Sequence, residues 1–348
     1  MSGKRLFFVV PGDIDTPTGG YGYDRRIAAG LRDLGWQVEI VSLPGTYPDT
    51  GAETLEAAAS AFAALPDTAL TLVDGLAYAR LPQIVERQSG RLRFAALVHH
   101  PLADEGDLPA PTARAFEADE IGALEQAHAV ICTSETTGRR LVERYAVSPA
   151  KLHVAPPGTE RKSILTDKRR KTILLCVGSI VPRKGHDVLI EALARLADID
   201  WSARFVGPPR DDGWKNRLDR LIATHGLEDR ISFIGPLADL DSEYKQAGIF
   251  VLATRHEGYG MAYAEALAAG LPVVGCAVGA VPEVVPPDAG ALVPPDDPAA
   301  FASALRKLLT DTNAYDKAAQ GARRAAETLP RWEDSVAIIA RALEGIDT

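Results

Sequence analysis

The stretch EGYGMAYAEALAAGLPVV (residues 257–274) predicts a loop, a helix and a buried strand in succession. Gly258 and Gly260 open the helix, and residues without a side chain let a ligand approach the backbone closely. The free N–H groups and the dipole at a helix start favour an anion. Glu257 precedes this start, and Glu265 lies about a turn and a half inside the helix. Carboxylates on both sides of an anion site suit a ligand with phosphates in the middle and hydroxyl groups at both ends, which describes a nucleotide sugar.

Short apolar segments alternate with helical patterns along the chain, which is typical of parallel sheets covered by helices. The expected strands form two series, 5–10, 37–43, 69–73, 93–98, 129–132 and 151–154, then 172–177, 203–206, 231–234, 249–252, 272–274 and 291–293. Helical patterns include 22–34, 52–65, 113–127, 136–145, 298–309, 314–328 and 331–344.

A polar, basic segment separates the two series of strands. We therefore expect a first α/β domain at 1–160, a linker at 161–171 and a second α/β domain at 172–328. Ligands of open α/β sheets bind beyond the carboxyl ends of the strands. Two such domains are thus expected to face each other across a cleft at these ends.

The composition is that of an ordinary globular protein, with 348 residues, 46% hydrophobic and 24% charged. The net charge of −9 argues against general nucleic-acid binding. We find no signal-peptide pattern and no apolar run of membrane-spanning length, so the expected location is the cytoplasm, with peripheral contact to a membrane left open. Cys132, Cys176 and Cys276 lie far apart in apolar segments and are expected to be buried free thiols.

The loop GSIVPRKGHD (residues 178–187) follows an expected strand and precedes an expected helix. Arg183 offers a bidentate fork and Lys184 a point charge, and the helix start adds its dipole. With Gly178 at its beginning, this loop is suited to hold a diphosphate.

Two features of the first half follow strands in the same way. The loop PGDIDTPTGGYG (residues 11–22) carries the pair Gly19-Gly20, with a spacing that does not fit a dinucleotide fingerprint. His99 directly follows the apolar run 94–98, so we favour it over His100 as a residue that faces a ligand.

These motifs together resemble the retaining, nucleotide-sugar-dependent glycosyltransferases of family 4, which have the GT-B fold and a Glu-x7-Glu motif. The resemblance covers nearly the whole chain but is specific only from about residue 173 to residue 295. It implies that the final helix, in 329–348, crosses back to the first domain and that 230–237 lines the nucleobase pocket. The family arginine after the first glycine of the phosphate loop is Ser179 here, and we infer that Arg183 replaces it. The implied catalytic residues are Glu257, His99 and Lys184, and the implied donor-binding residues are Arg183, Lys184, Gly178, Gly258, Tyr259, Gly260, Met261, Glu265, Gly19 and Gly20.

The resulting hypothesis is a retaining glycosyltransferase that moves a hexose from a nucleoside-diphosphate sugar, with UDP favoured, to an unidentified hydroxyl acceptor. No Asp-x-Asp motif ends a strand, so neither a metal nor another cofactor is expected. The pairs Asp211-Asp212 and Asp296-Asp297 are interpreted as solvated turns.

Two alternatives stay open. One is a GT-B-fold sugar-nucleotide epimerase, which would need no acceptor, or a phosphorylase, which would need phosphate. The other is a non-catalytic subunit that only binds nucleotide sugars, and Ser179 in place of the family arginine is the feature that favours it.

Overall fold

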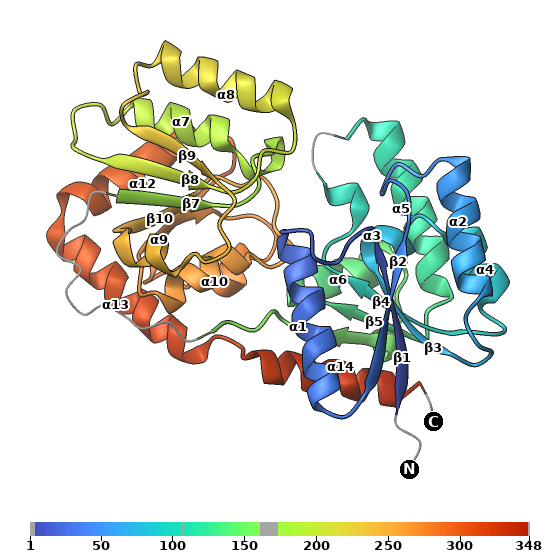
Figure 1. The fold of residues 1–348 in the computed structure, drawn as a ribbon. Helices are drawn as coiled ribbons and strands as arrows, with labels where there is room; N and C mark the ends of the chain where they lie inside the picture. The colour runs from blue at the N-terminus through green and yellow to red at the C-terminus, as the bar shows by residue number, and fades with distance from the viewer. Residues whose placement is uncertain (1–3, 106–107, 161–172, 347–348) are drawn as a thin grey trace. The chain divides into compact units, whose positions relative to one another are not determined.

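The computed structural model describes residues 4–105, 108–160 and 173–346. The chain divides into two compact units, one formed by Met1–Gly158 together with Pro330–Thr348 and the other by Thr159–Leu329 (Figure 1). The expected linker, 161–171, lies outside the described residues.

The first unit is built on a parallel sheet of six strands in the order β2-β1-β3-β4-β5-β6. Alternate residues of β1 point to opposite faces, so Leu6 and Phe8 join one hydrophobic cluster while Phe7 and Val9 join another. Both faces are therefore covered, which explains the continuous apolar runs of these strands. The strands are β1 (Arg5–Pro11), β2 (Gln37–Leu43), β3 (Leu70–Asp74), β4 (Arg93–Val98), β5 (Ala129–Cys132) and β6 (Leu152–Val154).

The helices of the first unit are α1 (Gly19–Asp33), α2 (Ala52–Ala63), α3 (Gly75–Tyr78), α4 (Pro82–Gln88), α5 (Ala110–Glu125), α6 (Glu135–Arg144) and α14 (Trp332–Glu344), with 3-10 turns η1 (Leu102–Asp104) and η2 (Pro149–Lys151). Helix α14, from the end of the chain, packs on α1 (Figure 1). The fit is close, because a Cβ at Gly30 of α1 would lie 2.4 Å from a methyl carbon of Val336. Ile339 and Leu343 of α14 are fully buried in the cluster that contains Leu6 and Phe8.

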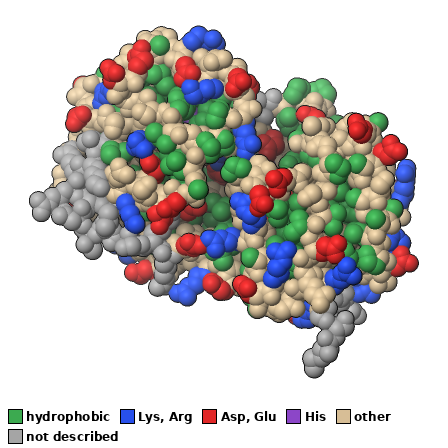
Figure 2. All heavy atoms as spheres, viewed as in Figure 1, with side chains coloured by type: hydrophobic (Ala, Val, Ile, Leu, Met, Phe, Trp, Pro, Cys, Tyr) green, Lys and Arg blue, Asp and Glu red, His purple; other side chains and the backbone are tan. Residues whose placement is uncertain are grey.

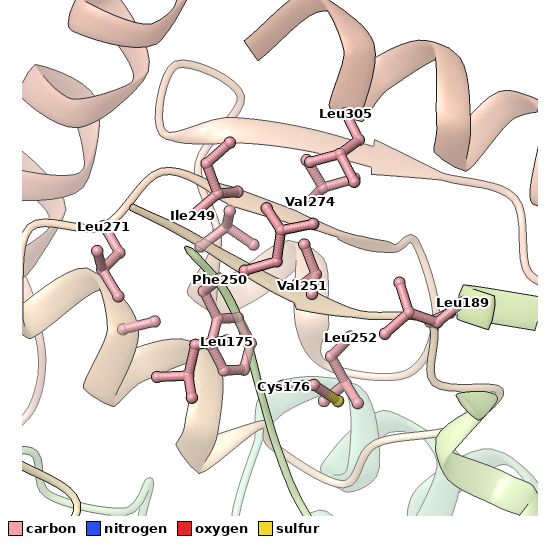
Figure 3. Packing of buried hydrophobic residues seen from close by; sticks show 14 of the residues in the cluster. Leu175, Cys176, Leu189, Ile249, Phe250, Val251, Leu252, Leu271, Val274 and Leu305 are labelled. Atoms are coloured by element: carbon pink, nitrogen blue, oxygen red, sulfur yellow. The ribbon is translucent and has the colours of Figure 1, made fainter. Parts of the chain in front are cut away.

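The second unit has its own parallel sheet of six strands in the order β12-β11-β10-β7-β8-β9. Leu175, Phe250 and Val274 come from the adjacent strands β7, β10 and β11 and form the centre of its core (Figure 3). Leu189 of α7 and Leu305 of α12 pack into the same cluster. The strands are β7 (Ile173–Val177), β8 (Ser202–Val206), β9 (Ile231–Gly235), β10 (Ile249–Leu252), β11 (Val273–Cys276) and β12 (Gly290–Val293).

The second unit adds the 3-10 turn η3 (Pro182–Lys184) and the helices α7 (His186–Ala194), α8 (Asp212–Thr224), α9 (Asp241–Gln246), α10 (Met261–Ala268), α11 (Val281–Val284), α12 (Pro298–Thr310) and α13 (Thr312–Thr328). Cys132 of the first unit and Cys176 and Cys276 of the second are buried, and none of the three forms a disulfide with another described residue. Within the described ranges, no helix has the length and apolar character needed to span a membrane. Acidic and basic side chains are interspersed over the face shown in Figure 2.

The predicted fold class, with two α/β domains built on parallel sheets, is confirmed. The expected strands are present, each with bounds within two residues of those predicted. Two helix starts were wrong by three residues, because α1 begins at Gly19 rather than at residue 22 and α5 begins at Ala110 rather than at residue 113. The Thr18 side chain accepts a hydrogen bond from Tyr21 N (3.2 Å), so Gly19 and Gly20 belong to the first helical turn and not to a loop.

The interpretation of the aspartate pairs as solvated turns holds in part, since Asp211, Asp212 and Asp296 are exposed and Asp296 lies in a turn, but it misses two helix caps. Asp211 caps α8 by accepting hydrogen bonds from the backbone N–H groups that follow it, and Asp297 caps α12 in the same way. Asp212 is the first residue of α8. Asp296 forms an ion pair with Arg255 at 2.8 Å.

Candidate functional site

The second unit brings the phosphate loop and the first glutamate of the Glu-x7-Glu motif into direct contact. Lys184 Nζ lies 2.5 Å from Glu257 Oε1. One position earlier, the Arg183 guanidinium donates to the backbone carbonyl of His256 (3.0 Å), and the buried Thr254 hydroxyl donates to the same carbonyl (2.9 Å). The loops after β7 and β10 are thus fixed to each other at the point where both strands end.

The contact with Lys184 favours the charged form of Glu257. Burial raises the pKa of Glu257, but the nearby cations of Lys184 and Arg183 outweigh that effect and hold the pKa below its usual range. Glu257 is only 7% exposed, so water does little to stabilise its negative charge. The ammonium group of Lys184 is therefore the main group that compensates the cost of burying this charge. An anionic ligand that binds here would compete with Glu257 for the Lys184 ammonium group.

Gly185 lets the phosphate loop lie directly on the end of β10. Its φ is +64°, and a Cβ at this position would lie 1.9 Å from the carbonyl oxygen of Ala253. Helix α7 begins immediately afterwards, at His186. Gly178, at the other end of the loop, faces the Lys184 side chain. A Cβ added at Gly178 would lie 3.4 Å from Lys184 Cε.

The residues between the two glutamates form the start of α10. Gly260 has φ +100° and precedes Met261, the first residue of the helix. Gly258 and Tyr259 lie in the preceding turn, where Tyr259 is buried. The start of α10 therefore follows Glu257 closely, as the sequence predicts.

Glu265 is held by a residue that the sequence did not indicate. The Tyr244 hydroxyl, on α9, donates to Glu265 Oε2 at 2.8 Å. Tyr244 is fully buried, and its sequence context is that of an ordinary core aromatic residue. No local pattern could have identified it, because α9 and α10 are separated by β10 in the sequence.

In the first unit, His99 and Gly20 lie together. A Cβ at Gly20 would be 3.5 Å from the imidazole Cδ2, and Gly19 precedes it at the helix start. The imidazole Nε2 lies 3.1 Å from Asp24 Oδ1 and 3.3 Å from Asp74 Oδ2. Both carboxyl groups are buried.

The electrostatics of this cluster favour a charged imidazole. Burial lowers the pKa of His99, but Asp24 and Asp74 more than compensate and raise it to about 10. Burial and the neighbouring Asp74 raise the pKa of Asp24.

Sequence reasoning missed both aspartates. Asp74 ends strand β3, so the logic that selected His99 would have found it, whereas Asp24 lies inside α1 without a local signal.

The same three side chains could also hold a cation, because one ligand atom from each of Asp24, Asp74 and His99 lies within 4.8 Å of the others. The donor set of two carboxylates and one imidazole is compatible with a divalent transition metal. The expectation that no metal is required therefore stays a prediction.

Comparisons with solved structures define the fold. Sucrose-phosphate synthase from Thermosynechococcus elongatus superposes with a TM-score of 0.83 at 22% identity, over 99% of both chains. Anabaena HepE in complex with UDP and glucose gives a TM-score of 0.76 at 19% identity, over 98% of this chain and 99% of that one. The protein therefore has the two-domain α/β fold of GT-B glycosyltransferases.

Sequence comparisons relate the chain to known glycosyltransferases, through a family profile that matches the second unit and through relatives that match a larger part of the chain. Residues 159–325 match the profile of the family described as "Glycosyl transferases group 1". D-inositol 3-phosphate glycosyltransferase of Salinispora tropica is 31% identical over 260 residues, which is 66% of this chain and 53% of the relative. The Geodermatophilus obscurus protein of the same name is 32% identical over 253 residues, 66% of this chain and 55% of the relative. The chain thus spans about half the length of these curated relatives.

Proposed function

We propose that this protein is a retaining glycosyltransferase of family 4 that moves a hexose from a nucleoside-diphosphate sugar, with UDP favoured, to a hydroxyl acceptor. The observation that carries the proposal is the contact between Lys184 and Glu257 inside the region that matches the glycosyl transferases group 1 profile. Related folds have been solved with UDP and glucose and with UDP and GlcNAc, which supports UDP as the nucleotide.

Lys184 and the starts of α7 and α10 are proposed to hold the donor diphosphate. Negative charge develops on the leaving diphosphate during transfer, and fixed cations and helix dipoles that stabilise this charge accelerate the reaction. Arg183 is proposed to assist in place of the family arginine, although in this structure it donates to the carbonyl of His256. The acceptor is a hydroxyl compound, and no metal is proposed to take part.

The two glutamates are proposed to bind different ends of the donor. Glu265 would accept hydrogen bonds from the ribose hydroxyls and Glu257 from hydroxyls of the transferred sugar, which His99 would also contact. The structure supports separate roles, because Glu265 is bound by the neutral Tyr244 hydroxyl whereas Glu257 forms an ion pair with Lys184.

Calorimetry with bare UDP tests these roles. Glu265→Ala and Lys184→Ala should each weaken UDP binding by about 1.5–3 kcal/mol, or about 10- to 150-fold in Kd, while Glu257→Ala should not weaken it, because it frees Lys184 from its ion pair. Glu327→Ala, which changes an exposed glutamate of α13, is the control. Equal weakening by Glu257→Ala and Glu265→Ala would contradict the assignment.

Turnover separates the proposal from its alternatives. A transferase should release UDP from a UDP-hexose faster when a hydroxyl acceptor is added, and the product should keep the anomeric configuration of the donor. An epimerase would convert the donor without an acceptor. A non-catalytic subunit, the reading favoured by Ser179, would bind UDP without releasing sugar from any donor.

A further inference from the structure

We propose that Arg255 is a positioning residue that anchors the phosphate loop of the second unit, so that Lys184 keeps the place from which it binds the donor diphosphate. The part of Lys184 in donor binding rests on the proposed function, whereas the anchoring of the loop does not. Arg255 lies between the end of β10 and Glu257, on the segment against which the phosphate loop packs.

The Arg255 side chain contacts the phosphate loop on both sides of Lys184. Before Lys184, the carbonyl of Pro182 accepts a hydrogen bond from Nη1. After Lys184, the two carboxylate oxygens of Asp187 accept from Nη1 and Nη2, at 3.1 and 3.0 Å. The backbone N–H of Arg255 also donates to the carbonyl of Arg183 (2.8 Å). Because these partners flank Lys184, Arg255 fixes the backbone of the short segment that carries it.

A second anchor holds the guanidinium itself. Its Nε donates to Asp296 Oδ1 at 2.8 Å, in the turn that follows β12. Asp296 has φ +56°, a left-handed conformation that aspartate adopts more readily than most residues. The next residue, Asp297, caps α12 by accepting from Ala300 N (2.8 Å), which ties this turn to the start of a helix. Arg255 is therefore held from a part of the unit that is separate from the phosphate loop.

These contacts use most of the hydrogen-bonding capacity of Arg255. A guanidinium has five N–H donors, and here Nε makes one contact, Nη1 two and Nη2 one. The side chains of Arg255 and Asp187 are 23% and 16% exposed, so the pair is largely shielded from water. A lysine ammonium is a point charge and cannot reproduce this planar arrangement. Arg255 is thus suited to act through Lys184 and not as a ligand of the donor itself.

Calorimetry with UDP on the full chain tests this role through a double-mutant cycle. Arg255→Lys keeps the positive charge and removes the planar fork, and it should weaken UDP binding about tenfold. In the Lys184→Met background the same change should weaken binding less than about threefold, because the residue through which Arg255 acts is already gone. Arg306→Lys is the matched control, since Arg306 forms a bidentate pair with Asp198 on the surface of the same unit (2.7 and 2.8 Å) and should leave UDP binding unchanged.

Asp296→Asn is a milder variant that tests the second anchor if Arg255→Lys does not fold. Asparagine accepts the same left-handed backbone, so the substitution removes only the charge that faces Nε. It should weaken UDP binding about two- to threefold in the wild type and much less in the Lys184→Met background. Unchanged UDP binding in both Arg255→Lys and Asp296→Asn would overturn the proposal.

Thermal unfolding without ligand tests the anchoring independently of the proposed function. Lys184→Met should lower the Tm of Arg255→Lys less than about half as much as it lowers that of the wild type, because a loop without its anchor no longer holds Lys184 against Glu257. Equal falls in Tm in the two backgrounds would overturn the proposal, and so would a loss of UDP affinity on Arg255→Lys that is the same with and without Lys184. A wild-type protein that does not bind UDP would instead refute the proposed function, and the thermal cycle would then decide on the anchoring.

Discussion

Replacing Lys184 by methionine should destabilise the second unit by leaving Glu257 charged and buried. The substitution keeps the aliphatic stem and removes only the ammonium group that lies 2.5 Å from Glu257 Oε1. Breaking a buried ion pair costs about 3–5 kcal/mol. The two side chains are 15% and 9% exposed and Arg183 remains nearby, so we expect the lower end, about 3 kcal/mol. For a unit of this size that corresponds to a fall in Tm of about 6–12 °C.

The destabilisation should depend on pH. In the wild type the pKa of Glu257 is lowered, so its charge contributes stability above the pKa of the unfolded chain, and this stability is lost as pH falls through the folded-state value. Without Lys184 the burial of Glu257 raises its pKa in the folded state. The difference in Tm between wild type and variant should therefore be largest near pH 7 and shrink below about pH 4.5.

Scanning calorimetry of the full chain measures both effects. Lys184→Met/Glu257→Gln should recover most of the lost Tm, because no buried charge is left without a partner. Lys215→Met is the control, since Lys215 pairs with Asp219 on the surface of the same unit, where an ion pair contributes about 0–1 kcal/mol. A double variant as unstable as Lys184→Met, or a loss of Tm that is equal at pH 4 and pH 7, would refute the reasoning.

Three further predictions concern the metal requirement of transfer and the binding of the donor. Sugar transfer should survive EDTA, and a loss of activity that Mg²⁺ or Mn²⁺ restores would show a metal requirement. Gly185→Ala should lower stability by about 2–4 kcal/mol and abolish UDP binding, because the new Cβ would meet the carbonyl of Ala253 at 1.9 Å. Gly226→Ala has almost the same φ, +63°, but open space around the Cβ, so it should cost only about 1 kcal/mol in thermal unfolding. Tyr244→Phe should weaken UDP binding about 2- to 10-fold in calorimetry by releasing Glu265, and unchanged binding would remove Tyr244 from the site.

The sequence was sufficient to predict the helices and strands and those candidate site residues that stand in a recognisable local pattern. Runs such as 5–10 and 249–252 are apolar on both faces, and this pattern specifies buried parallel strands wherever they lie in the chain. Glu257, Lys184 and Gly185 stand beside strand ends and helix starts, which are themselves visible in the sequence. The start of α1 was missed because the Thr18 cap competes with the helix-breaking tendency of the two glycines that follow.

Only the tertiary structure decided which side chains meet. Lys184 reaches Glu257, 73 residues away, because β10 pairs with β7 and the loops after both strands emerge side by side. Asp74 reaches His99 because β3 pairs with β4, and Asp24 joins them from α1, 75 residues before His99. Strand order and helix packing depend on how the whole chain buries its apolar surface, and local sequence patterns do not encode them. They decide which side chains meet, and the neighbours of Glu257 and His99 in turn decide the charges of these two residues.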